Sequence, residues 1–266
     1  PDASLLNEAD KWILSRVNRL AKDVTENMDK FELGIAVQKV YDFIWDEFCD
    51  WYVETAKYRI YHKEEEKAAA DCVLWVLKTV LKQALKLLHP FMPFITEEIY
   101  SVLVPEEESL MMSEWPQFYA EWDFPAEENV MEHVKEITRG IRNMRAEMNV
   151  PNNRKTKVYV VCEDTEICDG ISTLENSIKP LMMAEKILVQ QTKENIADNA
   201  VSVVVPDAVV YLPLEDLVDF EQEMERLQKE EEKLKKEIKR AEGMLSNERF
   251  ISKAPEAKVQ EEREKL

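Results

Sequence analysis

Glycine is scarce in this sequence. Among 266 residues there are four, at positions 34, 140, 170 and 243. Walker-type phosphate loops and dinucleotide-binding fingerprints need several closely spaced glycines, because the backbone must approach the phosphate, so both motifs are excluded. Long apolar runs are also lacking. None approaches the ~20 residues that span a bilayer, and no basic segment precedes an apolar stretch as in a secretory leader. We therefore expect no membrane partner and a cytoplasmic location.

Cysteine and histidine, the usual metal ligands and nucleophiles, are few as well. The four cysteines form no C-x-x-C pair, so reduced thiols in a cytosolic protein are expected. The three histidines are too dispersed for a zinc site. Acidic pairs such as Glu97-Glu98 are adjacent in the chain and point about 100° apart on a helix, so they do not face one substrate. The sequence thus predicts no metal, no cofactor and no catalytic residue in this chain.

Charge and composition limit the remaining functions. The formal net charge is −19, which repels a polyanion at long range. Salt screens charges beyond about 10 Å, so local basic clusters can still act separately. The 45% hydrophobic content is enough for a folded core, and the length suggests about two domains of roughly 100–200 residues. The chain begins with Pro1 and not with Met, which suggests a piece of a longer polypeptide.

Residues 1–150 are predicted to form an antiparallel helical bundle. Apolar residues at 13, 17, 20 and 24 share one face of a first helix, for which Asn7 is a plausible N-cap. A second helix over 32–61 carries an aromatic stripe of Tyr41, Trp45, Phe48 and Tyr52, which we interpret as core. Further helices are expected over 73–87, 93–100 and 127–149, because prolines end or open helices at these boundaries.

The pattern changes twice after residue 150. Residues 151–213 contain β-branched runs at 158–161 and 201–205, followed by a turn into 208–212, which predict a small α+β module with a mostly antiparallel sheet. A helix is expected at 171–178 and a short strand near 187–190. From 214 to 266, apolar residues alternate at spacings of three and four over 217–245, which indicates a coiled-coil seam. A second helix beginning near Pro255 predicts a truncated antiparallel hairpin, whose exposed seam could pair with another chain.

Two basic clusters stand out against the acidic background. Between residues 135 and 157 only Glu136 and Glu147 are acidic, whereas seven residues are basic. Guanidinium groups suit bidentate phosphate contacts, so these are candidate RNA-backbone ligands: Lys135, Arg139, Arg142, Arg145, Arg154, Lys155 and Lys157. The second cluster lies opposite the coiled-coil seam as a ridge roughly 21 Å long: Arg226, Lys229, Lys233, Lys236 and Arg240. The residues alone leave two functions open, an RNA-binding part of a larger enzyme or a non-catalytic adaptor that uses the coiled coil.

Several strings resemble the bacterial valyl-tRNA synthetase family of class I aminoacyl-tRNA synthetases. They run from 10 to 16 (DKWILSR), 45 to 52 (WDEFCDWY), 88 to 98 (LHPFMPFITEE) and 141 to 151 (IRNMRAEMNVP). The segments LPL at 212–214, KAP at 253–255 and EREKL at 262–266 are similar to the terminal coiled coil of that family. The third string is shared in weaker form with the isoleucyl and leucyl relatives, which therefore remain an alternative.

The resemblance implies a helical anticodon-binding bundle, a small junction module and a coiled-coil arm that binds tRNA. The parent enzyme joins valine to its tRNA with ATP and magnesium, but the family's H-x-G-H and K-M-S-K-S motifs are absent here. This chain would therefore hold tRNA(Val) and depend on catalytic and editing domains of the same polypeptide. Candidate anticodon contacts are Lys11, Trp12, Arg16, Arg19 and Phe31. Packing between helices is the alternative for the two aromatic residues.

Overall fold

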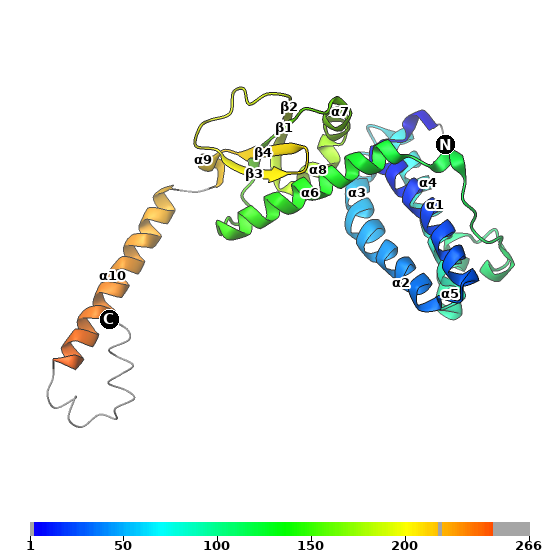
Figure 1. Cartoon of the computed structure of the whole chain (residues 1–266), viewed down its shortest axis with the longest axis horizontal. Coiled ribbons are helices and arrows are strands. Elements are labelled where there is room, and N and C mark those ends of the chain that lie inside the picture. Colours follow the sequence, from blue (N-terminus) through cyan, green and yellow to red (C-terminus); the bar gives the residue numbers. More distant parts are fainter. Residues whose placement is uncertain (1–2, 218–219, 247–266) are drawn as a thin grey trace. The chain divides into compact units, whose positions relative to one another are not determined.

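The computed structural model describes residues 3–217 and 220–246, which belong to two compact units, Pro1–Leu217 and Val218–Leu266. In the first unit, helices form the N-terminal part and a small four-stranded sheet follows (Figure 1). Among the described residues, no helix is long and apolar enough to cross a membrane. The two units are described separately below.

The N-terminal part consists of helices, as the sequence predicts, and the longer segment 104–124 connects the last two of them. The long helices are α1 (Glu8–Asp29), α2 (Leu33–Asp42), η2 (Phe43–Val53), α3 (Glu54–Tyr61), α4 (Lys67–Leu88), α5 (Pro93–Leu103) and α6 (Pro125–Glu147). Three short 3₁₀ turns accompany them: η1 (Ala3–Leu5), η3 (Leu110–Met112) and η4 (Ala120–Trp122). The expected helices at 73–87, 93–100 and 127–149 correspond to α4, α5 and α6.

The start of α1 is fixed by a reciprocal cap that also joins three helices. The predicted N-cap Asn7 is confirmed: its Oδ1 accepts from the Asp10 backbone N at 3.0 Å, and Asp10 Oδ2 accepts from the Asn7 N at 3.1 Å. Asp10 is fully buried, and its Oδ1 also accepts from the Tyr52 hydroxyl at 2.6 Å and from Arg59. A buried carboxylate needs such partners, so Asp10 ties α1 to η2 and α3.

The helix expected over 32–61 is continuous, but its middle is π-helical. Residues 43–53 form η2, an 11-residue π-helix between α2 and α3. A π turn closes with i→i+5 hydrogen bonds and so holds more residues than an α turn, which rotates the aromatic stripe. Phe48 and Tyr52 are buried, whereas Tyr41 and Trp45 are 57% and 58% exposed. The expectation that all four aromatic residues lie in the core is wrong for Tyr41 and Trp45.

The α+β part is a four-stranded sheet with helices on one side. Its strands are β1 (Thr156–Cys162), β2 (Ala184–Gln190), β3 (Val201–Val205) and β4 (Ala208–Leu212), in the order β2-β1-β4-β3. Only β1 and β2 pair in parallel, so the predicted mostly antiparallel sheet is confirmed. The single helix expected at 171–178 is instead two, α7 (Thr165–Thr173) and α8 (Glu175–Met182).

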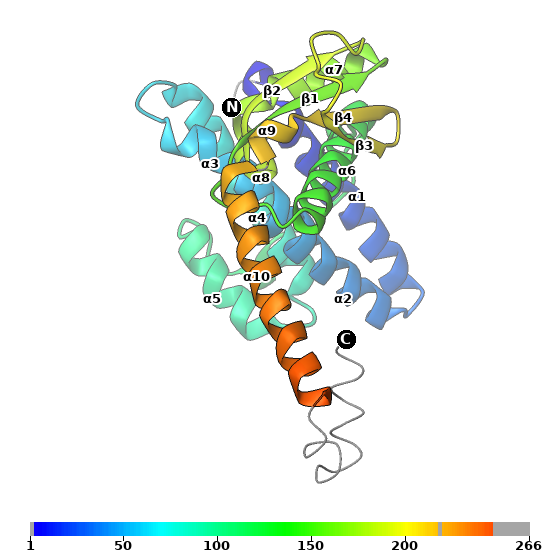
Figure 2. The ribbon, with the colours of Figure 1, turned by 90° about the vertical axis from the view of Figure 1, so that its left-hand side faces the viewer.

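Helix α6 joins the bundle to the sheet and runs beside the edge strand β3 (Figures 1 and 2). The contact is so close that a Cβ on Gly140 would lie 2.6 Å from Cγ1 of Val203. Gly170 of α7 similarly allows close approach to Val130 of α6. Small residues at these two positions therefore set the distance between α6 and its neighbours.

One cysteine pair differs from the expectation of four reduced thiols. Cys162 at the end of β1 and Cys168 in α7 are joined by a disulfide. Asp164 caps α7 through its side chain, and this turn brings the start of α7 back toward the end of β1. Cys49 is exposed and Cys72 is buried, and neither belongs to this disulfide.

The second unit contains one described helix, α10 (Phe220–Leu245), which follows the short α9 (Leu214–Leu217) of the first unit. Seam residues Met224, Leu234 and Ile238 are exposed, whereas Ala241 is buried. The expected second helix of the hairpin, near Pro255, lies outside the described residues.

Candidate nucleic-acid interface

A cleft of about 590 Å³ lies between α1, the α2–η2 segment and the loop that precedes α6. The predicted anticodon candidates Arg16 and Arg19 both line it, next to Lys22 and Phe118. The structure thus brings two of the five anticodon candidates together. Phe118 and Lys22 were not predicted. The Lys22 ammonium lies 5.7 Å from the Phe118 ring centroid. The two residues are far apart in the sequence, so no local sequence pattern predicts this contact.

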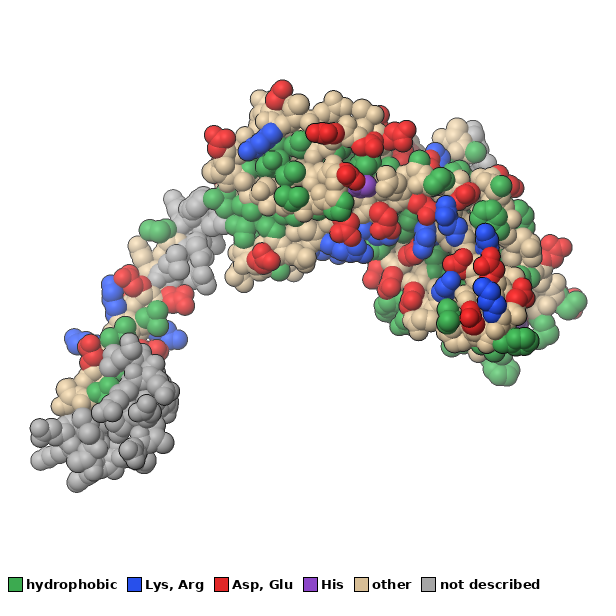
Figure 3. Space-filling model, in the orientation of Figure 1, with side chains coloured by type: hydrophobic (Ala, Val, Ile, Leu, Met, Phe, Trp, Pro, Cys, Tyr) green, Lys and Arg blue, Asp and Glu red, His purple; other side chains and the backbone are tan. Residues whose placement is uncertain are grey.

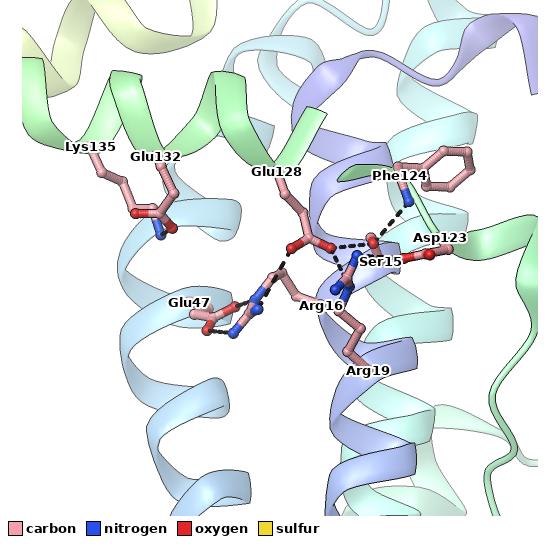
Figure 4. A network of polar contacts seen from close by, with 9 residues as sticks. All are labelled: Ser15, Arg16, Arg19, Glu47, Asp123, Phe124, Glu128, Glu132 and Lys135. Carbon is pink, nitrogen blue, oxygen red and sulfur yellow. Dashed lines mark hydrogen bonds and ion pairs between the residues drawn. The ribbon is translucent and has the colours of Figure 1, made fainter. Parts of the chain in front are cut away.

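The two arginines of this cleft are held by carboxylates (Figure 4). Arg16 donates through Nε and Nη2 to Glu47, both at 2.7 Å, and Arg19 Nη2 donates to Asp123 at 2.7 Å. Glu128 of α6 pairs with both arginines and accepts from the Ser15 hydroxyl. The hydrogen bond to Glu47 raises the pKa of Arg16. The network therefore orients the guanidinium groups but also neutralises them.

The other two candidates on α1 lie at its junction with α6. Trp12 is fully buried, so it is a core residue and offers no face to a base. The Lys135 ammonium lies 5.2 Å from the Trp12 ring centroid and pairs with Glu132. Lys11, half-buried, donates to Glu127 at 2.9 Å. The prediction of Trp12 as an anticodon contact is corrected in favour of helix packing.

Phe31 occupies the turn between α1 and α2. Its side chain is 87% exposed and its φ is +60°, a left-handed conformation that is uncommon for a bulky residue. The Phe31 N donates to the Met28 carbonyl at 2.9 Å and the Glu32 N to the Asn27 carbonyl at 2.8 Å, which close the turn. Packing between helices, the alternative for Phe31, does not apply, because the ring projects into solvent.

The basic cluster of 135–157 does not form one exposed stripe. Lys135 and Arg145 are buried, whereas Arg139 and Arg142 are exposed, because α6 packs against helices on one side and β3 on the other. Arg139 pairs with Glu136 at 2.6 Å, and Arg142 Nε donates to the Leu181 carbonyl at 3.1 Å. Two of the four candidate RNA-backbone ligands on this helix, Lys135 and Arg145, are therefore buried.

The remaining members of that cluster divide into structural and unpaired groups. Arg154 donates to the carbonyls of Asp216 and Glu215 at 2.6 and 3.2 Å and so anchors α9. Lys155 and Lys157 are exposed. Within the described part of the chain, neither ammonium group has a carboxylate within 4 Å. These two lysines therefore remain available for phosphate.

The predicted ridge on α10 is also exposed. Lys229, Lys233, Lys236 and Arg240 are all exposed on this helix. Lys233, Lys236 and Arg240 form no ion pair with any described carboxylate, whereas Lys235, outside the ridge, pairs with Glu231 at 2.6 Å. The side chain of Arg226 lies outside the described residues.

The described residues contain no cluster of three or more His, Cys, Asp or Glu side chains that could hold a metal ion. Over the bundle, positive and negative side chains are interspersed, as Figure 3 shows. A surface of interspersed charges is suited to binding a polar partner.

Comparisons with known proteins define the class of this fold. Residues 10–160 match the family model of the anticodon-binding domain of tRNA ligase. The chain therefore belongs to this tRNA-ligase anticodon-binding family. Residues 219–266 match the model of the valyl tRNA synthetase tRNA binding arm. The valyl-tRNA synthetase resemblance inferred from the sequence strings is thereby confirmed.

Curated valine–tRNA ligases are similar along almost the whole chain. The enzyme of Clostridium perfringens is 51% identical over 257 residues, which cover 97% of this chain and 29% of the relative. Those of Clostridium tetani and Clostridium acetobutylicum are 48% and 46% identical, over 99% and 97% of this chain. The chain spans less than a third of the length of these relatives, and it corresponds to their C-terminal portion.

Proposed function

We propose that this chain is the tRNA-binding C-terminal portion of a valyl-tRNA synthetase and that it holds tRNA(Val) without performing the reaction. The observation that carries the proposal is that one chain contains both matched segments, an anticodon-binding domain followed by a tRNA-binding arm. The whole enzyme would attach valine to tRNA in the cytoplasm with ATP and magnesium. Its catalytic and editing domains would be the other partners of this chain.

In this proposal the chain has three parts with separate contacts. Residues 1–150 are the anticodon-binding bundle, residues 151–213 a small junction module and residues 214–266 the coiled-coil arm. In the proposal the arm is a helical hairpin whose seam runs along α10. The exposed seam residues Leu234 and Ile238 support a further partner for this face, either the second helix of the hairpin or another chain.

The cleft beside α1 is the best-supported place for unpaired anticodon bases. Unpaired bases are read by stacking and by hydrogen bonds to their edges. Arg16 and Arg19 supply oriented donors, Glu47 and Asp123 supply acceptors, and the Phe118 ring, 41% exposed, can stack. Lys11 lies on the same helix, and Phe31 offers a second exposed ring at the α1–α2 turn.

A tRNA titration tests the function and the role of the arm together. Filter binding of the 266-residue chain to valine tRNA and to a non-cognate tRNA, at two or more salt concentrations, should show tighter binding of the valine tRNA. Lys233→Gln/Lys236→Gln should lower the slope of log K against log salt by about 1.4–1.8, if each lysine neutralises one phosphate. Lys235→Gln/Lys239→Gln removes the same charge from the same helix outside the ridge.

Three outcomes separate the possibilities. A smaller slope for the ridge variant than for its control supports the arm contact. Equal slopes for the two variants would refute the ridge as the phosphate-binding face. No measurable tRNA binding by the unmodified chain would refute the proposed function and favour a coiled-coil adaptor.

A further inference from the structure

A second cleft, of about 440 Å³, lies between α3, α8 and the turn that connects α6 to β1. It belongs to the first unit and shares no residue with the cleft beside α1. Six of its ten lining residues carry a side-chain hydrogen-bond donor: Tyr58 of α3, Asn152, Asn153 and Lys155 of the turn, and Asn176 and Lys179 of α8. The cleft thus joins the bundle to the sheet module with groups that donate hydrogen bonds.

Most of these donors have no partner among the residues that the structure describes. Within the described part of the chain, the side chains of Asn152, Asn153 and Asn176 make no hydrogen bond, and the Lys155 ammonium has no carboxylate within 4 Å. Lys179 has only a distant carboxylate, Glu175 at 4.0 Å. Three amides and the Lys155 ammonium therefore face one cavity without a partner among the described residues, beside Lys179, which has an ion pair with Glu175.

Hydrogen bonds from Arg145 stabilise the turn that carries two of these amides. Buried Arg145 donates through Nη2 to the carbonyl of Pro151 at 3.0 Å and to that of Arg154 at 2.6 Å. The Arg154 N also donates to the Pro151 carbonyl at 3.1 Å. Burial lowers the pKa of Arg145, but arginine stays charged in proteins. Arg145 is therefore a positioning residue that preorganises Asn152 and Asn153.

Positive charge adjoins the mouth of the cleft. The parallel strands β1 and β2 begin here, and their register places Lys157 opposite Lys186, on neighbouring strands about 4.8 Å apart. Both lysines are exposed. Glu185 is the one acidic residue that lines the cavity. In a chain of net charge −19, this concentration of lysines marks the cleft as a place for an anion.

We propose that this cleft binds the sugar–phosphate backbone of RNA. Lysine, asparagine and tyrosine side chains are among the groups that contact phosphate and sugar in complexes with nucleic acids. An asparagine amide can also donate to and accept from a ribose 2′-hydroxyl, which distinguishes RNA from DNA. The inference rests on the proposed function, because the same bound tRNA supplies the backbone. It gives the junction module a direct contact with the ligand.

A nearly isosteric substitution that introduces negative charge tests the cleft. Asn152→Asp/Asn176→Asp replaces two amides by carboxylates that repel phosphate, and both residues are exposed, so folding should be unaffected. We expect tRNA affinity to fall about tenfold or more, with an unchanged urea midpoint. Asn195→Asp/Asn199→Asp makes the same chemical change at two exposed positions of the β2–β3 loop. Hydroxyl-radical footprinting of bound tRNA should show ribose protection lost in the cleft variant alone.

The outcomes distinguish this inference from the function on which it rests. If the unmodified chain binds no tRNA, the proposed function fails and the cleft inference fails with it. If the unmodified chain binds but the cleft variant matches its control in affinity and footprint, the cleft inference alone is refuted. Competition of a polyglutamate peptide with tRNA, abolished in the cleft variant, would reassign the cleft to an acidic peptide.

Discussion

Trp12 and Trp45 occupy environments opposite to those that the sequence predicts, and substituting each by alanine tests the core of the bundle. Trp12 is fully buried, and Lys135 of α6 lies over its ring. Replacing a buried tryptophan by alanine costs about 3–5 kcal/mol in unfolding free energy. The lost cation–π contact adds about 0.5–2 kcal/mol. Trp12→Ala should therefore lose at least about 3 kcal/mol.

Trp45→Ala should cost much less. The residue is 58% exposed, so less than half of a surface of at most ~250 Å² is removed from water. At ~25 cal/mol per Å², about 100 Å² corresponds to an upper estimate of about 2.5 kcal/mol. Residual compactness of the unfolded chain lowers this value to about 1.5–2 kcal/mol.

Urea unfolding followed by circular dichroism measures both variants with one method, and tRNA titration of the same samples separates stability from binding. We expect a large loss of stability for Trp12→Ala, a small one for Trp45→Ala, and no specific loss of tRNA affinity for Trp12→Phe. A Trp12→Ala variant that keeps its stability but loses tRNA affinity would show that this ring contacts RNA after all. Equal destabilisation by both alanine variants would contradict the burial of one and the exposure of the other.

Two further predictions concern packing and pH. Gly140→Ala places a Cβ 2.6 Å from Val203 and should lower the free energy of unfolding by about 1–3 kcal/mol. In urea unfolding, Gly140→Ala/Val203→Ala should lose less free energy than the sum of the two single variants. Strict additivity would contradict the close approach. Hydrogen bonds from Lys82 and Tyr100 lower the pKa of Glu107, so its stabilisation is present above the ordinary glutamate pKa and is lost as pH falls through the lower folded value. In Glu107→Gln the free energy of unfolding should therefore fall less between about pH 5 and 3 than in the unmodified chain. An equal fall in the two proteins would exclude this contribution.

Elements with regular periodicity could be predicted from the sequence. The apolar spacing of α4, the prolines at the start of α5 and α6 and the β-branched runs of β1, β3 and β4 act within a few residues. The π-helical segment Phe43–Val53 could not be predicted in this way. Its altered turn changes which aromatic residues face the core. An α-helical pattern therefore places Trp45 in the core, whereas the structure shows it exposed.

The candidate site was predicted less completely, because partners across the fold decide what a charge can do. The sequence identifies Arg16 and Arg19 as basic residues on one helix but not their carboxylate partners, 31 and 104 residues away. Arg145 similarly looks like a phosphate ligand in the sequence. In the fold it is buried under the turn that it stabilises. Phe31 differs, because the hydrogen bonds that close its turn join residues close together in the sequence.

The pairing of charges determines how each contact with RNA would respond to salt. Arg16 and Arg19 already have carboxylate partners, so a phosphate that binds them replaces a carboxylate and releases few extra counterions. Lys155, Lys233 and Lys236 have no such partner among the described residues, and each phosphate they neutralise contributes fully to the salt slope. Phosphate contacts with Arg16 and Arg19 should therefore be nearly independent of salt, whereas the arm and the junction cleft supply the salt-sensitive part of the affinity.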